Sequence, residues 1–352
     1  MDCLHPIRLE ASLRETIWGG QGLEREGWKH LPARNAAIGE AWETEVNTIA
    51  QNGPYADKTL GTLVNELGVT LLGKQPMAIF GPRFPLLAKF IDANAKLSVQ
   101  VHPDDRYAAQ HENGKLGKTE FWYVLAAEPG ATIVHGFKAP TSRAEVLRAI
   151  EEVKLEQLLH EEVVYAGDVI FVPPGTVHAI GSGVMLYELQ EYSDITYRMY
   201  DYGRLTAAGT PRELHVAQSL DVSRYEVSPK VKVQPVALAG GQEYEDRCLV
   251  ACQYFVTREI IFQQSENAHG YMKGKTGDSC VILTSLDAEV QICYGNELRC
   301  SEMLARGQTM VLPAELGNYC IEGTGRLMFS YVPKRGDEAW RLWEEKNREF
   351  TR

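Results

Sequence analysis

A short segment near residue 100 places polar side chains on one face of a predicted strand. In KLSVQVHPDD (96–105), alternate side chains of an extended chain share a face, so Ser98, Gln100 and His102 point one way and the apolar residues between them point the other. An imidazole and an amide oxygen on one face can bind a divalent cation. An ordinary surface strand would present the same row to water. Whether the row is a metal site or a solvated face therefore depends on whether other strands place ligand side chains beside it.

A second segment supplies a carboxylate to the same point. The chain continues through a predicted helical turn and returns as KTEFWYV (118–124), where alternation puts Lys118 and Glu120 on one face. Two neighbouring strands of a small barrel could therefore direct Gln100, His102 and Glu120 toward one place. These three side chains are candidate metal ligands.

A third segment has the spacing of a known β-barrel motif. The pattern G-x5-P-x-G-x2-H (167–178) resembles the second cupin motif, in which a strand enters a Pro-Gly turn and the next strand begins with an inward-pointing histidine. This histidine, His178, is the fourth candidate ligand. The first cupin motif normally reads H-x-H closely followed by Glu, whereas this chain has Q-x-H and a more distant Glu120.

Two imidazoles, one carboxylate and one amide oxygen suit a borderline divalent ion, with zinc first and iron, manganese or cobalt as alternatives. Such a set leaves a coordination position for water or substrate, as catalytic sites do. The other histidines lie at no ligand spacing, and we interpret them as surface or core residues: His5, His30, His111, His135, His160, His215 and His269.

The elements that must position these residues are mostly strands. Short β-branched and aromatic runs alternate with Gly, Pro, Asn and Asp, a pattern typical of antiparallel barrels and sandwiches. Helical patterns are predicted at 58–72, at 140–153 with a Ser142–Glu145 capping box, and from about Asp337. We therefore predict a mainly β protein of two cupin-like (jelly-roll) β-barrels with a few packing helices.

An internal repeat suggests the domain organisation. The segments GDVIFVPPGTVHAI (167–180) and GQTMVLPAELGNYC (307–320) align without gaps, and Asn318 stands where the first copy has His178. We predict a metal-binding catalytic domain over 1–225 with helical insertions, a second cupin-like barrel without metal ligands over 226–336, and a C-terminal helix over 337–352.

The composition and charge of the whole chain exclude some classes of function. It has 352 residues, 44% hydrophobic and 24% charged, with a formal net charge of -11 and scattered basic residues, which argues against nucleic acid as a partner. The N-terminus lacks a signal-peptide core, and no stretch approaches the length of a membrane span, so we expect a cytoplasmic protein without membrane contact. Seven cysteines without a C-x-x-C pair predict reduced thiols.

Several ordered motifs together resemble one enzyme family. The segments AKLSVQVHPDD (95–105), GKTEFWYV (117–124), GDVIFVPPGTVHAI (167–180) and QEYSDITYR (190–198), with the early IWGG (17–20) and GEAWE (39–43), look like type I mannose-6-phosphate isomerase in its shorter bacterial form. The resemblance implies one zinc ion per chain, a small sugar-phosphate substrate and a monomer or homodimer. It implies interconversion of mannose 6-phosphate and fructose 6-phosphate through an enediol.

The resemblance also implies residue roles. Gln100, His102, Glu120 and His178 match the metal ligands, and Arg198 matches the active-site arginine. Ser98 and Lys118 match residues of the substrate pocket, whereas Glu188 and Asp194 match acidic residues near the reacting carbons. We assign Arg198 and Glu188, the candidate base, to catalysis, and Ser98, Lys118 and Asp194 to substrate binding.

Two other functions remain open from the sequence. One is a metal-dependent cupin enzyme of another class, a dioxygenase or a different sugar isomerase. The other is a sugar-binding cupin without turnover. The charged residues Lys118, Glu120 and Arg198 argue against the second, since a degenerate pocket would be expected to lose charges that are costly to bury.

Overall fold

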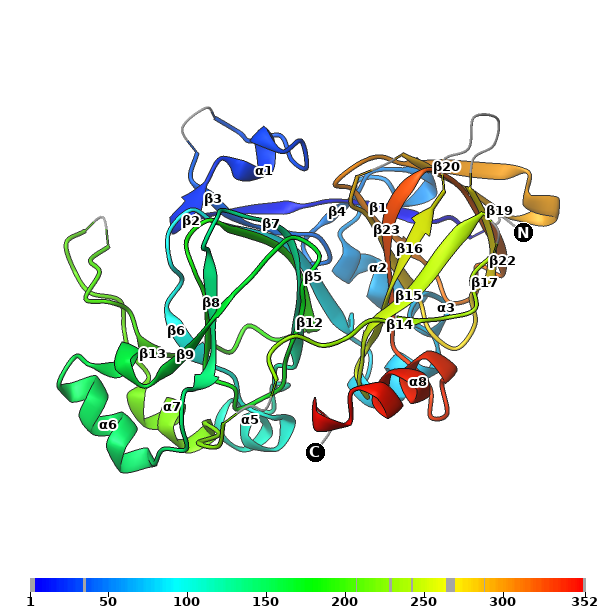
Figure 1. Ribbon diagram of the computed structural model, residues 1–352. Coiled ribbons are helices and arrows are strands. Elements are labelled where there is room, and N and C mark those ends of the chain that lie inside the picture. Colours follow the sequence, from blue (N-terminus) through cyan, green and yellow to red (C-terminus); the bar gives the residue numbers. More distant parts are fainter. Residues whose placement is uncertain are drawn as a thin grey trace.

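The chain folds into two β-rich lobes that lie side by side (Figure 1). The computed structural model describes residues 4–350 except 34–35, 207, 228–229, 242, 264–269 and 288, so Cys3 and His269 lie outside the described residues. Within the described part, the strands form four antiparallel sheets, two in each lobe. The predicted mainly β, antiparallel architecture is confirmed.

The first lobe consists of a six-stranded and a five-stranded sheet. The larger sheet has the order β10 (Val169–Val172), β7 (Glu120–Ala127), β12 (Val184–Glu191), β5 (Leu86–Ala93), β3 (Ile38–Trp42) and β2 (Ser12–Gly20). The smaller sheet has the order β13 (Tyr197–Tyr200), β6 (Val99–Val101), β11 (His178–Ile180), β8 (Thr132–Phe137) and β9 (Leu159–Val163). One apolar core joins the two sheets, with Trp122 and Ile170 from the larger and Ile133 and Ile180 from the smaller.

The second lobe pairs an eight-stranded sheet with a four-stranded sheet. The larger has the order β14 (Val236–Ala237), β15 (Tyr244–Ala251), β16 (Val256–Phe262), β23 (Gly325–Tyr331), β18 (Val281–Ser285), β21 (Thr309–Leu312), β1 (Ile7–Glu10) and β4 (Ile49–Ala50). The smaller has the order β17 (Gly270–Lys275), β22 (Asn318–Gly323), β19 (Val290–Tyr294) and β20 (Cys300–Leu304).

The two predicted cupin-like β-barrels are not confirmed. In the described residues each sheet ends in edge strands with one paired neighbour, such as β10 and β2 in the first lobe, so no sheet closes on itself. Facing sheets bury the inward-pointing side chains against each other. The two sheets of each lobe are therefore held together by packing of their facing side chains, and not by continuous strand pairing around a barrel.

The internal repeat seen in the sequence is also present in the fold. The sheet order β10-β7-β12-β5 of the first lobe corresponds to β21-β18-β23-β16 of the second, and β6-β11-β8-β9 corresponds to β17-β22-β19-β20. In both copies a glycine with positive φ, Gly167 or Gly307, lies two residues before a strand that leads through a turn into the smaller sheet. The two lobes are therefore structural repeats.

Eight α-helices and four 3-10 helices occur among the described residues. The α-helices are α1 (Gly22–Arg25), α2 (Leu60–Leu67), α3 (Val69–Leu72), α4 (Lys74–Phe80), α5 (Asp105–His111), α6 (Arg143–Glu151), α7 (Val216–Val222) and α8 (Glu338–Lys346). The 3-10 helices are η1 (Gly53–Tyr55), η2 (Leu155–Gln157), η3 (Asn296–Leu298) and η4 (Arg348–Phe350). In Figure 1, α5, α6 and α7 gather at one end of the first lobe, and α8 packs at the same end of the second.

The predicted helices are present with adjusted bounds. Gly68, with φ +50°, divides the predicted helix 58–72 into α2 and α3, because a positive φ interrupts the helical backbone. The predicted capping box is confirmed: the Ser142 hydroxyl accepts from the Glu145 N–H at the start of α6 and donates to the Glu145 carboxylate. Asp337 caps α8 in the same way, by accepting from the Trp340 N–H.

The N-terminal part of the chain crosses between the lobes. Strand β1 pairs with β21, with Ile7 opposite Val311, and the backbone carbonyl of Leu72 at the end of α3 accepts from the Cys280 N–H at 2.9 Å. The predicted boundary between 225 and 226 stays a prediction, and the first lobe's sequence also contributes strands and helices to the second lobe.

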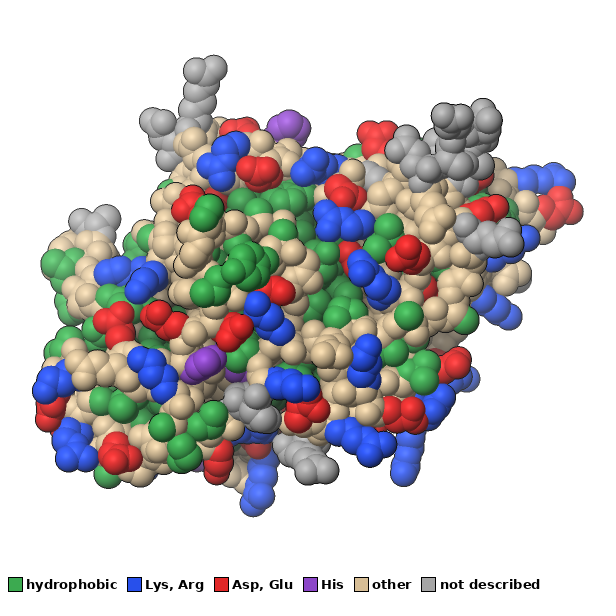
Figure 2. Space-filling view, in the orientation of Figure 1, with side chains coloured by type: hydrophobic (Ala, Val, Ile, Leu, Met, Phe, Trp, Pro, Cys, Tyr) green, Lys and Arg blue, Asp and Glu red, His purple; other side chains and the backbone are tan. Residues whose placement is uncertain are grey.

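The surface mixes charges of both signs. Lys and Arg side chains are interspersed with Asp and Glu over the face in Figure 2. Among the described residues, no helix is long and apolar enough to span a membrane. The six described cysteines form no disulfide, as the sequence predicts.

Candidate metal centre

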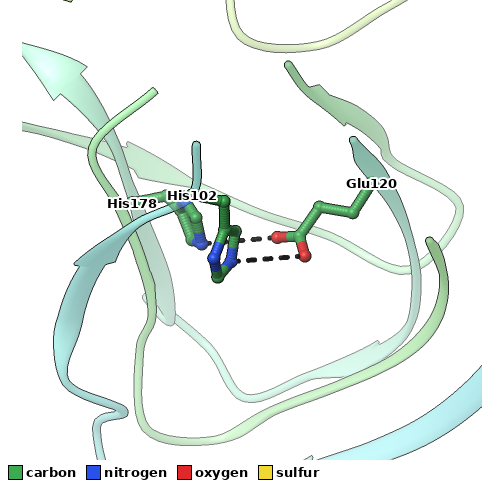
Figure 3. Close-up of side chains that lie close together, drawn as sticks. All are labelled: His102, Glu120 and His178. Carbon is green, nitrogen blue, oxygen red and sulfur yellow. Dashed lines mark ion pairs between the residues drawn. The ribbon is translucent and has the colours of Figure 1, made fainter. Parts of the chain in front are cut away.

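Three buried side chains from separate strands converge inside the first lobe (Figure 3). His178 begins β11, Glu120 begins β7, and His102 follows β6 directly. His178 Nε2 lies 3.3 Å from Glu120 Oε1, and His102 Nε2 lies 3.6 Å from Glu120 Oε2. One ligand atom from each of the three lies within 4.8 Å of the others. The predicted convergence of these strands is therefore present in the structure.

Backbone carbonyls fix the orientation of both imidazoles. His102 Nδ1 lies 2.8 Å from the carbonyl oxygen of Ile195, and His178 Nδ1 lies 2.8 Å from that of Thr176. A carbonyl can only accept, so each Nδ1 carries the proton and each Nε2 presents a lone pair toward Glu120. A carbonyl partner on the far ring nitrogen is the usual support of a metal-binding histidine.

Electrostatics favours a cation among these groups. Both Glu120 oxygens are buried, and the Lys118 ammonium pairs with Oε2 at 2.7 Å. Burial and the negative charge of Glu188 raise the pKa of Glu120 to about 7. Burial lowers the pKa of His178 to about 3, and that of His102 well below its usual value. Two lone pairs and a carboxylate facing one point fit a divalent cation.

Gln100 completes the set in the neighbouring strand. It lies directly opposite His178 in the register of β6 and β11, and its amide nitrogen is 3.3 Å from His178 Nε2. Rotation of the terminal amide by half a turn exchanges its nitrogen and oxygen, so the amide oxygen can reach the same place. The four predicted ligands are thus adjacent.

A cavity of about 430 Å³ opens beside these ligands. The predicted site residues Ser98, Gln100, Lys118, Glu188, Asp194 and Arg198 all line it. His102, Glu120 and His178 lie buried behind this wall. The cavity therefore brings one candidate ligand, Gln100, together with every residue assigned to substrate binding or catalysis.

Glu188 is an ionised carboxylate held in place from two sides. Its Oε1 lies 3.2 Å from Lys89 Nζ and 4.0 Å from Lys118 Nζ, and its Oε2 accepts from Trp122 Nε1 at 3.0 Å. Burial raises the pKa of Glu188, but Lys89, Lys118 and the Trp122 hydrogen bond outweigh burial and lower it. The group can therefore accept a proton at neutral pH.

Arginines line another part of the cavity. Arg198 is opposite Gln100 in the register of β13 and β6, and its Nη1 donates to the Glu213 carbonyl at 2.9 Å. Buried Asp201 holds Arg212 through Nε at 2.8 Å. Burial and the nearby Arg212 lower the pKa of Arg198. The Asp194 side chain is 67% exposed and pairs with Lys115 at 2.9 Å.

Lys89 and Arg212 were not predicted from the sequence. Lys89 is the one cation in the otherwise apolar stretch LLAKF, all of which is buried in β5, and that isolation is a usable signal. Burial alone would lower the pKa of Lys89, but Glu40, Glu188 and Glu120 raise it. Arg212 lies in a loop with no local pattern, so no sequence signal marks it.

Comparison with known proteins gives consistent matches. The family model described as phosphomannose isomerase type I, catalytic domain, matches residues 7–124. The chain is 34% identical over 334 residues to mannose-6-phosphate isomerase ManA of Bacillus subtilis (strain 168), covering 93% of this chain and 99% of that protein. It is 34% identical over 330 residues to mannose-6-phosphate isomerase of Streptococcus mutans, covering 93% and 98%.

Solved structures share the fold. The crystal structure of mannose 6-phosphate isomerase from Bacillus subtilis superposes with a TM-score of 0.81 at 31% identity, covering 93% of this chain and 99% of that one. A mutant of phosphomannose isomerase from Salmonella typhimurium gives a TM-score of 0.73 at 15% identity, with 93% and 99% coverage. At that lower identity the likeness concerns the fold alone.

Proposed function

The chain belongs to the type I mannose-6-phosphate isomerase family, and on that premise we propose that it interconverts mannose 6-phosphate and fructose 6-phosphate with one bound zinc ion. The observation that carries this proposal is the convergence of His102, Glu120 and His178 beside a cavity that Glu188 and Arg198 also line. Gln100 is proposed as the fourth ligand. Two imidazoles with an oxygen donor set suit zinc best.

The reaction needs stabilisation of charge on oxygen. Moving a proton between adjacent carbons of an aldose and a ketose passes through an enediol, and negative charge develops on the carbonyl oxygen. A bound divalent cation supplies Lewis-acid polarisation of that oxygen. Arg198 is permanently charged and is proposed to stabilise the same oxygen or hold the sugar from the cavity wall.

Glu188 is the proposed base. It faces the cavity and is ionised, and Lys89 and Trp122 fix its two oxygens so that the carboxylate has one orientation. A single base on one face of the substrate can remove the proton from one carbon and return it to the next. Lys89 acts here through Glu188 and is a positioning residue.

The rest of the cavity suits a phosphorylated sugar. Arg212 lies near Arg198 with its guanidinium fixed by Asp201, so it adds a second cation that can bind an anionic group. Ser98 and Lys118 lie closer to the metal ligands and are proposed to hold sugar hydroxyls, with Asp194 at the rim. These positions support a ligand with its carbonyl near Glu120 and its phosphate near Arg212.

A coupled assay with mannose 6-phosphate tests the proposal. The purified protein should form fructose 6-phosphate, lose activity after chelator treatment and regain it on adding zinc. Oxygen uptake in the same samples distinguishes a dioxygenase, since isomerisation consumes no oxygen. Binding of the sugar phosphate without turnover in the zinc-loaded protein would contradict the proposal and favour a non-catalytic sugar-binding protein.

A further inference from the structure

The second lobe contains a cavity at the position where the first lobe has the candidate active site. Its volume is about 310 Å³. It is lined from β16, β17, β22 and β23, the structural counterparts of β5, β6, β11 and β12, all of which line the first cavity. The repeat has therefore kept an opening between its two sheets in both lobes.

The strand registers show which groups were kept. In the first lobe Lys89 is opposite Glu188, and at the corresponding place in the second lobe Arg258 is opposite Phe329. Glu40 and Asp246 also correspond. Glu40 is paired with Ile91, two residues after Lys89, and Asp246 is paired with Ile260, two residues after Arg258. A cation beside a carboxylate thus occurs at one place in both lobes.

The metal-binding groups are absent from the second cavity. The position of Glu120, opposite the last residue of β10, corresponds to Val281, opposite the last residue of β21. The position of His178 is Asn318, whose side chain is exposed. Within the described residues of this lobe, no cluster of metal-ligating side chains replaces them. The second cavity therefore lacks the groups proposed for catalysis.

Arg258 is held so that part of its guanidinium faces the cavity. Its Nε donates to Asp246 Oδ1 at 2.9 Å and its Nη2 donates to Oδ2, whereas Nη1 donates to none of the described residues. The guanidinium lies over the Phe329 ring at 4.8 Å. The Asp246 side chain is 4% exposed and that of Arg258 is 20% exposed. A largely buried ion pair seldom adds stability over apolar packing, so its presence at a cavity wall calls for another role.

Two tyrosines add unpaired hydroxyl groups to the wall, and the exposed Lys273 and Lys275 also line the cavity. The hydroxyls of Tyr244 and Tyr319 bond to no described residue, and both side chains line the cavity. The Tyr331 hydroxyl donates to Asp337 Oδ2 at 3.0 Å. Aromatic surface with a few convergent polar groups at the mouth of a β-structure is the usual composition of a small-molecule site.

We propose that this second cavity binds a single sugar ring without converting it. Arg258 Nη1 and the Tyr244 and Tyr319 hydroxyls would bond to ring hydroxyls, and the tyrosine rings would cover the apolar face of the sugar. The choice of a sugar rests on the proposed function, because the first cavity of the repeat is proposed to hold one. The binding site itself rests on the cavity and its unpaired groups.

Methyl NMR can observe this cavity separately from the first. Met272 lines it, so its 13C-labelled methyl signal, assigned with Met272→Leu, reports binding in the second lobe alone. Mannose and mannose 6-phosphate should both shift this signal, and inorganic phosphate should not. Tyr319→Phe should weaken the effect by about fivefold or more, as expected for one lost hydrogen bond. Arg258→Lys, which keeps the charge beside Asp246, should also weaken it, whereas Tyr165→Phe in the first lobe should not.

Three results would overturn this proposal. They are an unchanged Met272 signal at about 10 mM of either sugar, a shift that inorganic phosphate alone reproduces, and a shift that persists unchanged in both cavity variants. The isomerase assay is independent of these signals. Loss of the proposed activity with an intact Met272 response, or the reverse, therefore shows which of the two proposals fails.

Discussion

Glu188 is the residue on which proton transfer depends in the proposed reaction. Glu188→Gln keeps the shape and the Trp122 contact but removes the basic oxygen, so kcat should fall by about a hundredfold or more while bound metal is retained. Steady-state kinetics and metal analysis of one preparation test this together. Glu161→Gln, at an exposed position on β9, is the matched control. An unchanged kcat in Glu188→Gln would assign the base elsewhere.

Acid should destabilise the metal-free protein partly through His178. Its pKa is about 3 in the folded state against 6.5 for the free side chain. Between pH 3 and pH 6.5 the unfolded chain therefore binds one more proton than the folded chain, and the free energy of unfolding decreases as the pH is lowered. The stability difference between wild type and His178→Gln should therefore shrink by about 1.4 kcal/mol per pH unit on acidification below 6.5. Denaturant unfolding after chelation measures it. The difference should be constant between pH 7.5 and 8.5, and a constant difference below pH 6.5 would contradict a buried neutral imidazole.

The turn between β10 and β11 positions two ligands at once. Gly175 has φ +83°, and its N–H donates at 2.9 Å to the carbonyl of His102, which links the two histidine segments. A Cβ there would lie 2.8 Å from the Val222 carbonyl oxygen, whereas a Cβ at Gly130, with nearly the same φ of +82°, would meet nothing within 4 Å.

This contrast gives a matched pair of variants. Gly130→Ala should cost about 1 kcal/mol of unfolding free energy through backbone strain alone. Gly175→Ala should cost more and weaken metal binding, because relief of the clash moves the turn that holds His178. Urea unfolding and metal titration of both variants test this. Equal costs with unchanged metal affinity would show that the turn does not position the ligand.

Elements with strong local signals were predictable from the sequence. The Ser142 capping box and the turn before His178 each depend on neighbouring residues, and both are present as expected. The division of helix 58–72 occurs at Gly68, a glycine with positive φ that the apolar periodicity did not mark, whereas the open sheets depend on packing between distant strands, which local patterns do not encode. The same holds in the site: strand alternation predicts Gln100 and His102, whereas Arg212 reaches the cavity only through the tertiary fold.

Buried and partly buried polar contacts join the two lobes. The Tyr254 hydroxyl of the second lobe donates at 2.6 Å to Asp105 of α5, in the insert that joins His102 to Glu120. The Tyr123 hydroxyl of β7 donates at 2.9 Å to Glu259 of β16. Together with the pairing of β1 and β21, these contacts connect the candidate metal centre to the second lobe.

The lobes should therefore unfold together. Scanning calorimetry of the intact chain is expected to give a single transition, because separating the lobes would expose buried apolar and polar groups of both. A fragment of residues 1–225 leaves β1 without β21 and should lack a cooperative transition. Two separate transitions, or a stable fragment that binds metal like the whole chain, would show that the first lobe is an independent domain.

Metal content shows directly whether His102, Glu120 and His178 hold one divalent ion. Mass-spectrometric metal analysis of the zinc-reconstituted chain should give one zinc per chain, and His102→Ala and His178→Ala should each lose it together with isomerase activity. Zinc bound at full stoichiometry in both variants, or no zinc in the reconstituted wild type, would show that these three side chains do not form the metal site.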